Sequence, residues 1–490
     1  MTPNEPVQSS LFEELKRKAG AVSATRLMSV GAALVVAMVL TRLLDEDLYG
    51  AYRKLWLIYA MFGTIITSTV IGTLYYRSGT ESERGDAAGV ALFFALVGGL
   101  FIALISWFGA DFWASSLNAP HLADGFRMFA PYLFFGIFAA SAEPLFVIFH
   151  RKKWLIAYTG IYNLIEGALI VIPFAMGMPL ERVVIIMSAG PALRSVAVIL
   201  FAAGHGVNFP RMSVLRRELR PFVAYAAGIL MVSVAGIAAM EADKWIVGIY
   251  FDSDALYAIY VVGAKKLPFV GAITSAIAAG VVAQYSSLIR GGSYTEALYA
   301  CRKASAILLF ILLPMISVSW VLAEDILVFL FEKYADSAPV FRIYLFVLLS
   351  NTLLVSSFVL AHGLSRVNAL TGLAELVVNV LLSIILISFI GLEGPAWATL
   401  TAHIIYTVIL LMYCKIRLDV SPVEFLPARG SWPVIPVTVL AFVLALLIRT
   451  MTGNVIITVL SGGMIVAVAI VFLLWTSRAF SQFDSGNKDM

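Results

Sequence analysis

Long apolar stretches alternate with short polar connections along almost the whole chain. A membrane-spanning helix needs about 20 mostly apolar residues. Fourteen stretches qualify, at 21–44, 52–76, 88–108, 128–149, 154–176, 182–203, 221–250, 255–286, 304–323, 342–361, 367–390, 395–414, 432–448 and 455–475. In hydrocarbon every backbone amide must be bonded within the protein, and no alternating pattern of about ten residues suggests a barrel. The sequence therefore predicts an all-α polytopic membrane protein.

A short motif recurs about half a chain apart. LYGAY occupies residues 48–52 and LYAIY occupies residues 256–260, so the copies are 208 residues apart (256 − 48). We interpret the echo as two pseudo-symmetric copies of one six-helix unit. The predicted organisation is an N-terminal cytoplasmic interfacial segment 1–20, a first lobe 21–204, a cytoplasmic linker 205–220, a second lobe 221–414, and a final part 415–490 with a cytoplasmic loop, two more helices and a short tail.

The N-terminal segment has an amphipathic pattern. Leu11, Phe12 and Leu15 share one helical face and charged residues occupy the other, which favours a helix lying at the membrane interface. A solvated tail is an equally open interpretation.

The composition excludes an ordinary soluble protein. Hydrophobic residues make up 61% of the chain, charged residues 13%, and the mean hydropathy is +0.93. Each polar connection is shorter than about 50 residues, which few folded domains fall below. We therefore expect no separate catalytic domain, and predict that the protein is not an enzyme.

The positions of lysine and arginine predict the orientation. With the N-terminus inside, the inner segments hold 21 of the 34 such residues, the outer segments hold 8, and five lie in or beside helices. Cytoplasmic loops retain these residues during insertion, so both termini are expected in the cytoplasm. The net charge of +4 reflects this topology, and it indicates no nucleic-acid partner.

The sequence contains no pattern typical of a metal site or a cofactor-binding site. Cys301 and Cys414 fall at predicted cytoplasmic helix ends, which argues against a disulfide framework. His403 alone is more typical of a packing residue than of a ligand. We find no metal-spaced cluster, phosphate-binding glycine loop or nucleophile set, and we expect no cofactor and no metal.

Charged residues within the predicted spans are the functional candidates, because burying them in a membrane is costly. The densest group surrounds the turn near residue 252, where Glu241, Asp243 and Lys244 precede the turn and Lys265 and Lys266 follow it. Glu241 and Lys265 lie at matching depth, so an ion pair between them is geometrically possible. The competing interpretation makes 241–266 an outer loop, but it exposes two large apolar runs to water.

The other charged candidates leave their roles open. Arg26, Arg53 and Lys54 either line a cavity or only flank the first two helices. Arg194 and Glu166 lie deep in helices of the first lobe and form either a structural pair or a substrate contact. Glu143 and Glu375 are either ion-coupling carboxylates or structural ones. These seven residues and the five charged residues of the hairpin, as we call residues 241–266, form the complete candidate set.

Two stretches carry a family resemblance. Residues 24–56, ATRLMSVGAALVVAMVLTRLLDEDLYGAYRKLW, and residues 243–267, DKWIVGIYFDSDALYAIYVVGAKKL, together with the fourteen helices and the repeat, resemble the Wzx-type oligosaccharide flippases. This family belongs to the multidrug/oligosaccharidyl-lipid/polysaccharide exporter superfamily.

The resemblance implies two bundles around a central cavity that opens alternately to either side of a bacterial inner membrane. The implied cargo is a polyprenyl-pyrophosphate-linked oligosaccharide, and the implied partners are membrane lipids and polysaccharide polymerase or assembly proteins. A pyrophosphate crossing a low-dielectric cavity needs fixed cations. The implied head-group contacts are Arg26, Arg53, Lys54, Lys244, Lys265 and Lys266, with Arg194 as a further substrate contact. The resemblance further implies that Glu241 and Asp243 pair these cations in the empty cavity, and that uphill transport would need protons or sodium on a carboxylate such as Glu143 or Glu375.

Three other functions remain open at this stage. A multidrug extruder of the same superfamily usually has twelve helices and a cavity with carboxylates for cationic drugs. A membrane polymerase or glycosyltransferase needs a large outer loop with catalytic groups. A structural scaffold leaves the buried charges without a role.

Overall fold

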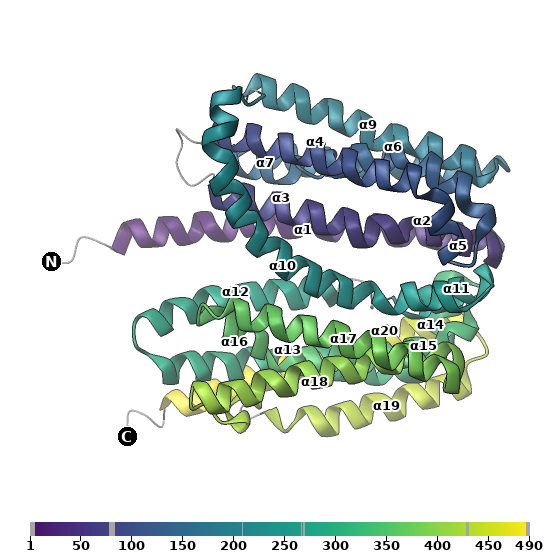
Figure 1. The fold of residues 1–490 in the computed structure, drawn as a ribbon. Coiled ribbons are helices and arrows are strands. Elements are labelled where there is room, and N and C mark those ends of the chain that lie inside the picture. The colour runs from purple at the N-terminus through teal and green to yellow at the C-terminus, as the bar shows by residue number, and fades with distance from the viewer. Residues whose placement is uncertain are drawn as a thin grey trace. The chain divides into compact units, whose positions relative to one another are not determined.

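The computed structural model describes residues 5–77, 84–207, 209–265, 267, 270–427 and 431–486. These residues form helices joined by short turns, with no β-strand among them (Figure 1). The predicted all-α class is therefore confirmed. The chain divides into two compact units, Met1–Glu241 with Gly248–Ala258, and Ala242–Val247 with Ile259–Met490.

The first unit contains the helices up to and including most of the long helix α10, which both units share. They are α1 (Glu5–Leu43), α2 (Glu46–Ile58), the π-helical turn η1 (Tyr59–Gly63), α3 (Thr64–Arg77), α4 (Arg84–Phe108), α5 (Ala110–Ser116), the 3₁₀ turn η2 (Pro120–Leu122), α6 (Ala123–Ala139), α7 (Ala142–Ile148), α8 (Lys152–Ala175), α9 (Leu180–Gly204) and α10 (Met212–Tyr250).

The second unit continues from a helix that starts in the first. Its elements are α11 (Asp254–Gly263), α12 (Val270–Arg290), α13 (Tyr294–Val321), α14 (Ala323–Phe331), η3 (Ala335–Ser337), α15 (Ala338–Ser350), η4 (Asn351–Leu353), α16 (Val355–Ala361), α17 (Ser365–Ile390), η5 (Gly391–Glu393), α18 (Gly394–Arg417), η6 (Pro422–Phe425), α19 (Val434–Met451) and α20 (Val455–Gly486). Every span predicted from the sequence falls on one or two of the α-helices.

Twelve stretches of the described residues are long and apolar enough to cross a membrane. One of them, Ser365–Arg417, contains both α17 and α18, which correspond to two separate predicted spans. The span predicted at 255–286 corresponds to α11 and α12, and residues 266, 268 and 269 between them lie outside the described part. The protein is thus a polytopic membrane protein.

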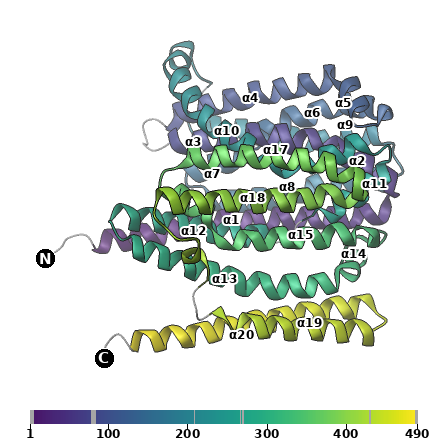
Figure 2. The ribbon, with the colours of Figure 1, turned by 60° about the horizontal axis from the view of Figure 1, so that its bottom comes forward.

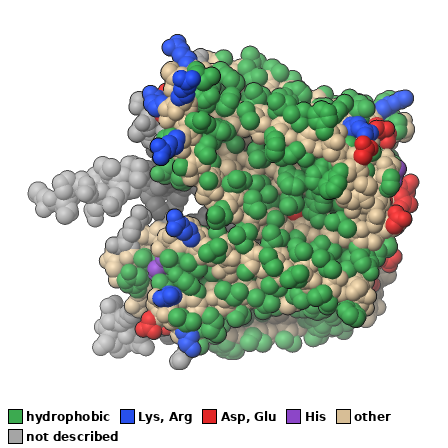
Figure 3. Space-filling view, in the orientation of Figure 1, with side chains coloured by type: hydrophobic (Ala, Val, Ile, Leu, Met, Phe, Trp, Pro, Cys, Tyr) green, Lys and Arg blue, Asp and Glu red, His purple; other side chains and the backbone are tan. Residues whose placement is uncertain are grey.

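Apolar side chains cover the flanks of both units. Figure 3 shows these side chains as a broad green surface, with charged side chains gathered toward the helix ends. Leu164 and Phe389, for example, expose 76% and 80% of their surface. Exposure of large apolar side chains on this scale is unfavourable in water but favourable against lipid.

The order of elements repeats between the two halves of the chain. α4 to α9 are followed by α13 to α18, and the series begin at Arg84 and Tyr294, 210 residues apart (294 − 84). The packing repeats as well. In the first unit α4 packs on α6, and α6 and α8 pack on α9; in the second α13 packs on α15, and α15 and α17 pack on α18. This correspondence supports two copies of one unit, while the predicted lobe boundaries remain a prediction.

The sequence motif of the repeat marks two equivalent helix starts. Oδ1 of Asp45 accepts a hydrogen bond from the backbone N–H of Leu48 at 2.7 Å, at the start of α2. Oγ of Ser253 accepts one from the backbone N–H of Leu256 at 3.2 Å, at the start of α11. Such caps satisfy backbone donors that have no partner in the first helical turn. The two motifs therefore begin their helices in the same way.

The last two helices pack against the second unit's own bundle. α19 lies along α13, and α20 contacts α13, α14 and α19 (Figure 2). Val318, Leu322, Ala441 and Ala445 form part of one buried apolar cluster at this contact. Apolar packing alone is weakly specific between helices in lipid, so the polar contacts at the helix ends matter for position.

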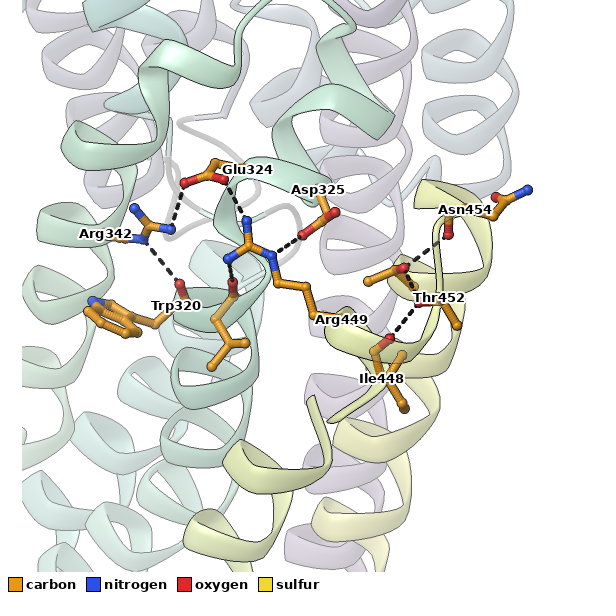
Figure 4. Close-up of polar contacts among 10 residues, drawn as sticks. Trp320, Glu324, Asp325, Arg342, Ile448, Arg449, Thr452 and Asn454 are labelled. Carbon is orange, nitrogen blue, oxygen red and sulfur yellow. Dashed lines mark hydrogen bonds and ion pairs between the residues drawn. The ribbon is translucent and has the colours of Figure 1, made fainter. Parts of the chain in front are cut away.

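Four charged side chains connect α19 to α14 and α15 within the second unit (Figure 4). Arg449 of α19 lies 2.5 Å from Oε2 of Glu324 and 3.0 Å from Oδ2 of Asp325, and it donates to the carbonyl of Val321 at 3.2 Å. Arg342 of α15 contacts Oε1 of Glu324 at 3.1 Å and donates to the carbonyl of Trp320. Glu324 therefore links two arginines from different helices.

Replacing Glu324 by glutamine should weaken this junction in a pH-dependent way. Burial acts to raise the pKa of the carboxyl, but hydrogen bonds from Arg342 and Arg449 outweigh it and hold the pKa below 4.5. A lowered folded pKa gives stability that is present above the unfolded value and lost as the pH falls through the folded one. We expect Glu324→Gln to cost about 1 kcal/mol, because the side chain is 44% exposed.

Thermal unfolding in detergent, from pH 8 down to about pH 3, measures this effect. The gap in melting temperature between wild type and Glu324→Gln should be constant at neutral pH and close only in acid. Asp336→Asn, at an exposed carboxylate of η3, is the matched control and should show no gap. An equal gap at every pH would contradict the charge-based explanation.

Candidate functional site

The charged side chains of the membrane helices form separate clusters in the two units. The most deeply buried cation of the first unit is Lys54 on α2, whose side chain is fully buried. Its Nζ lies 2.7 Å from Oδ1 of Asp254 at the start of α11 and donates to the carbonyl of Leu117 at 3.0 Å. Nε2 of His121 lies 2.9 Å from the other oxygen of Asp254. Lys54 is therefore enclosed, with Asp254 and the carbonyl of Leu117 as its polar contacts.

Further contacts hold residues 248–258 against the first unit. The side chain of Asn118 donates to the carbonyl of Ile249 at 2.6 Å, and Oδ1 of Asp47 accepts from the backbone N–H of Ala255 at 3.1 Å. Gly50 of α2 approaches Asp254 so closely that a Cβ built on it would lie 1.8 Å from the Asp254 carbonyl oxygen. The α10–α11 turn is therefore fixed by both side chains and backbone.

We expect Gly50→Ala to destabilise the protein by at least about 1–3 kcal/mol, the usual cost of overpacking, because a methyl group has no room there. Gly228→Ala in α10 is the matched control, since nothing lies within 4 Å of a Cβ at that position. The control should be neutral or slightly stabilising, because alanine favours a helix over glycine. Retention on size-exclusion chromatography after heating measures both. Equal melting temperatures for the two variants would contradict the close packing.

Arg53 follows a different pattern from its neighbour Lys54. Its Nε is buried and has no hydrogen-bond partner. Tyr49, Tyr52, Tyr257 and Glu241 are close enough to its guanidinium to interact with it electrostatically. A guanidinium with an unused donor can bind an anionic group.

Arg194 and Glu166 lie among tyrosines of the first unit. Nε of Arg194 donates to the hydroxyl of Tyr158 at 2.8 Å, and the guanidinium lies 4.3 Å from the ring centre of Tyr162. Oε1 of Glu166 accepts a hydrogen bond from the hydroxyl of Tyr132. The sequence left open whether these charges form a structural pair or contact substrate; here tyrosine hydroxyls and rings surround both.

An aromatic wall borders this charged group. The indole of Trp56 makes edge contacts with the rings of Tyr59, Phe129 and Tyr132 at centroid distances of 5.8, 5.6 and 5.0 Å. Such edge-to-face contacts add stability beyond apolar burial. The wall brings α2, η1 and α6 together beside Glu166 of α8.

Arg26 and Glu143, assigned different roles from the sequence, contact one another. NH2 of Arg26 donates to Oε1 of Glu143 at 3.2 Å, with 62% and 26% of the side chains exposed. An ion pair this exposed contributes little to stability. The sequence alone could not reveal this pair, because its partners are 117 residues apart.

Asp243 is the most enclosed acid of the second unit. Its side chain is fully buried, and its Oδ2 accepts hydrogen bonds from the hydroxyls of Tyr260 at 2.7 Å and of Tyr344. Its Oδ1 has no hydrogen bond, although Nζ of Lys244 lies 3.6 Å away. Asp243 therefore lies within ion-pair distance of Lys244 and accepts from two tyrosine hydroxyls, while its role in the empty cavity remains a prediction.

The remaining hairpin residues are distributed between the units. Nζ of Lys265 lies 4.5 Å from the centre of the Phe331 ring in the second unit. Glu241 is half-buried and belongs to the first unit, so the predicted Glu241–Lys265 pair remains a prediction. Lys266 lies outside the described residues.

Glu375 has a partner that the sequence analysis treated as a packing residue. Its Oε1 lies 2.7 Å from Nδ1 of His403, and both side chains are less than one-fifth exposed. Nothing in the local sequence indicates this contact, because Glu375 lies on α17 and His403 on α18. Among the described residues, no three His, Cys, Asp or Glu side chains gather as metal ligands do.

Comparison with known proteins identifies the family and the fold. Residues 39–339, more than half of the chain, match the family described as polysaccharide biosynthesis protein, whereas no curated protein matches. The structure is similar to the lipid II flippase MurJ in its inward closed conformation, with a TM-score of 0.69 and 16% identity over 94% of this chain and 98% of that one.

Two MATE transporters have a similar fold. The eukaryotic MATE transporter AtDTX14 has a TM-score of 0.60 and 14% identity over 83% of this chain and 96% of that one. A mutant of the Vibrio cholerae MATE transporter VcmN has a TM-score of 0.58 and 14% identity over 86% and 100%. The family match confirms the resemblance predicted from residues 24–56 and 243–267, and the structural similarities agree with the fold that it implies. The chain belongs to the polysaccharide biosynthesis protein family and is a multi-pass membrane protein with the fold of the MOP superfamily transporters.

Proposed function

We propose that this protein moves a polyprenyl-pyrophosphate-linked oligosaccharide from the cytoplasmic to the outer leaflet of a bacterial inner membrane, for cell-surface polysaccharide export. The observation that carries the proposal is the combination of a polysaccharide biosynthesis family with the fold of a lipid flippase. Movement proceeds by alternating access between two six-helix lobes, 21–204 and 221–414, with both termini in the cytoplasm. The protein acts as a transporter and not as an enzyme, beside the polymerase and assembly proteins of the same polysaccharide.

Arg53 and Arg194 are the strongest candidates for binding the pyrophosphate. Arg53 has an unused buried donor, and Arg194 is held by tyrosines that leave it positively charged. Arg26, Lys244, Lys265 and Lys266 remain proposed as further contacts. Lys54 becomes one when its pair with Asp254 opens, and Glu241 with Asp243 balances the cations in the empty state.

The test is a flipping assay in proteoliposomes that contain the polyprenyl-pyrophosphate oligosaccharide. A sugar-specific enzyme added outside measures how fast the glycan appears in the outer leaflet. Arg53→Gln and Arg194→Gln should each slow flipping about tenfold or more, because a charge-assisted hydrogen bond contributes about 1.5–3 kcal/mol. Arg217→Gln is the matched control, since that arginine is 64% exposed and already paired with Asp86 and Glu218.

The second candidate function is extrusion of a cationic drug, which the similarity to MATE transporters favours. Wild-type protein that leaves the lipid-linked glycan in place but expels a cationic dye supports extrusion and rejects the flippase. Size-exclusion profiles of all variants separate a loss of function from a loss of fold.

A further inference from the structure

A polar cluster lies between α17 and α18 of the second unit, whereas the two strongest arginine candidates belong to the first unit. Nδ1 of His403 lies 2.7 Å from Oε1 of Glu375, and the imidazole stacks on the ring of Tyr406 with centroids 5.5 Å apart. The hydroxyl of Tyr406 donates to Oδ1 of Asn368 at 2.8 Å, and Ser356 of α16 donates to the same oxygen at 2.9 Å. The cluster is thus a connected network and not an isolated pair.

The pair lies near the middle of its helices. Glu375 is ten residues from the start of α17, and His403 is nine residues from the start of α18. At 1.5 Å per residue each side chain is about 14–15 Å from a helix end. Both are less than one-fifth exposed. Ionisable groups at such depth are costly and are retained mainly where they have a function.

The chemistry of the pair differs from that of the other acids in the membrane helices. Glu143 contacts an arginine, which cannot release its proton, and Asp254 contacts the buried ammonium of Lys54. Glu375 contacts a histidine, the side chain that exchanges a proton most readily near neutral pH. When the imidazole is neutral and the carboxyl is ionised, the pair carries one negative charge. One additional proton, on either group, makes the pair neutral.

Other charges in the neighbouring elements point elsewhere. Arg342 of α15 contacts Glu324, Tyr344 of α15 contacts Asp243, and Glu424 of η6 accepts from the backbone N–H of Ser421. Glu393 of η5 precedes α18 at its N-terminal end, and His362 after α16 contacts the carbonyl of Phe358. Within the described residues the pair therefore has Tyr406 as its titratable neighbour and no lysine, arginine or second carboxylate in contact.

We propose that Glu375 and His403 form a site that binds one exchangeable proton in the second unit. Binding of the proton makes the pair neutral, and release restores one negative charge. The neutral pair is favoured in a low-dielectric environment and the charged pair in a polar one, so the two states favour different surroundings. Proton movement through this site couples glycan export to the proton gradient, a consequence that rests on the proposed function. From the sequence alone, the coupling ion could be a proton or sodium, and its carboxylate could be Glu143 or Glu375.

The first test needs no transport. Protein labelled with ¹⁵N-histidine is placed in lipid nanodiscs, and His403 is identified among the five histidines by the loss of its signal in His403→Gln. We expect the His403 signal to change between about pH 5 and 9, and to follow a different profile in Glu375→Gln. A signal that is constant over this range, or identical in Glu375→Gln, overturns the proton site whatever the protein transports.

The second test measures coupling in the flipping assay with an imposed pH gradient. Acceleration by the gradient should be lost in Glu375→Gln and His403→Gln and kept in His362→Gln, the matched control at a histidine outside the pair. Flipping that responds to the gradient equally in all variants overturns the coupling and leaves the flippase intact. Wild-type protein that flips nothing rejects the proposed function, and the histidine spectra then decide the proton site alone.

Discussion

Replacing Asp254 by asparagine is expected to destabilise the protein by about 3–5 kcal/mol, the typical cost of leaving a buried charge without its partner. The ammonium of Lys54 is fully buried, and Asp254 is its charged partner at 2.7 Å. After the substitution the carbonyl of Leu117, the new amide oxygen and the ring of Tyr257, whose centre is 5.7 Å from Nζ, remain near the cation, and none of them carries a negative charge. Proteins have total stabilities of about 5–15 kcal/mol, so the folded yield should fall sharply.

The opposite substitution should be milder. Lys54→Met leaves Asp254 with His121 at 2.9 Å, and that imidazole is 62% exposed to its surroundings, so the carboxylate keeps a hydrogen-bonding partner. Methionine also matches the apolar length of the lysine stem. The double variant Lys54→Met/Asp254→Asn should therefore be more stable than Asp254→Asn alone, which gives a large coupling energy in a double-mutant cycle.

Size-exclusion retention after heating in detergent measures all four proteins of the cycle. Asp252→Asn is the matched control, because that carboxylate is two residues away on the same turn and exposed. The control should change stability by less than about 0.5 kcal/mol. Additive effects of the two single substitutions would show that the ion pair does not hold the turn.

The helices were predictable because their signal is local. Each stretch of about 20 apolar residues specifies one crossing whatever its neighbours are. The internal repeat was visible from LYGAY and LYAIY, since both copies start a helix after a capping residue at the same offset. The apolar residues contain no comparable signal for the break between α6 and α7. They also contain none for the division of the span predicted at 255–286 into α11 and α12.

The partners of the charged residues were not predictable in the same way. Lys54 and Asp254 are far apart in the chain, and hydrophobic periodicity reports which face is buried but not which side chain lies opposite. The repeat places Asp254 at the position of Glu46, the first residue of α2, but it does not indicate which side chain lies opposite. His403 was set aside as a single histidine, because nothing local indicates Glu375 on the next helix.

The largest effect in the second unit should come from replacing Asp243 by leucine. The hydroxyls of Tyr260 and Tyr344 both donate to its Oδ2, and both tyrosines are buried. Leucine offers no acceptor, so both hydroxyls lose the carboxylate to which they donate, at about 1–3 kcal/mol each, and Lys244 loses the carboxylate beside it. Asp243→Asn keeps an acceptor oxygen of similar shape and should lose much less.

Two buried thiols provide a measurement specific to this unit. Cys301 and Cys414 are free and fully buried in one apolar cluster, so a thiol-reactive fluorogenic dye reports unfolding of the second unit on heating. Asp243→Leu should lower the melting temperature strongly. Adding Tyr260→Phe and Tyr344→Phe should restore much of it, because removing both donors and acceptor together is nearly neutral. If the triple variant is no more stable than Asp243→Leu, the unpaired hydroxyls are not the cause, and the buried charge itself stabilises the unit.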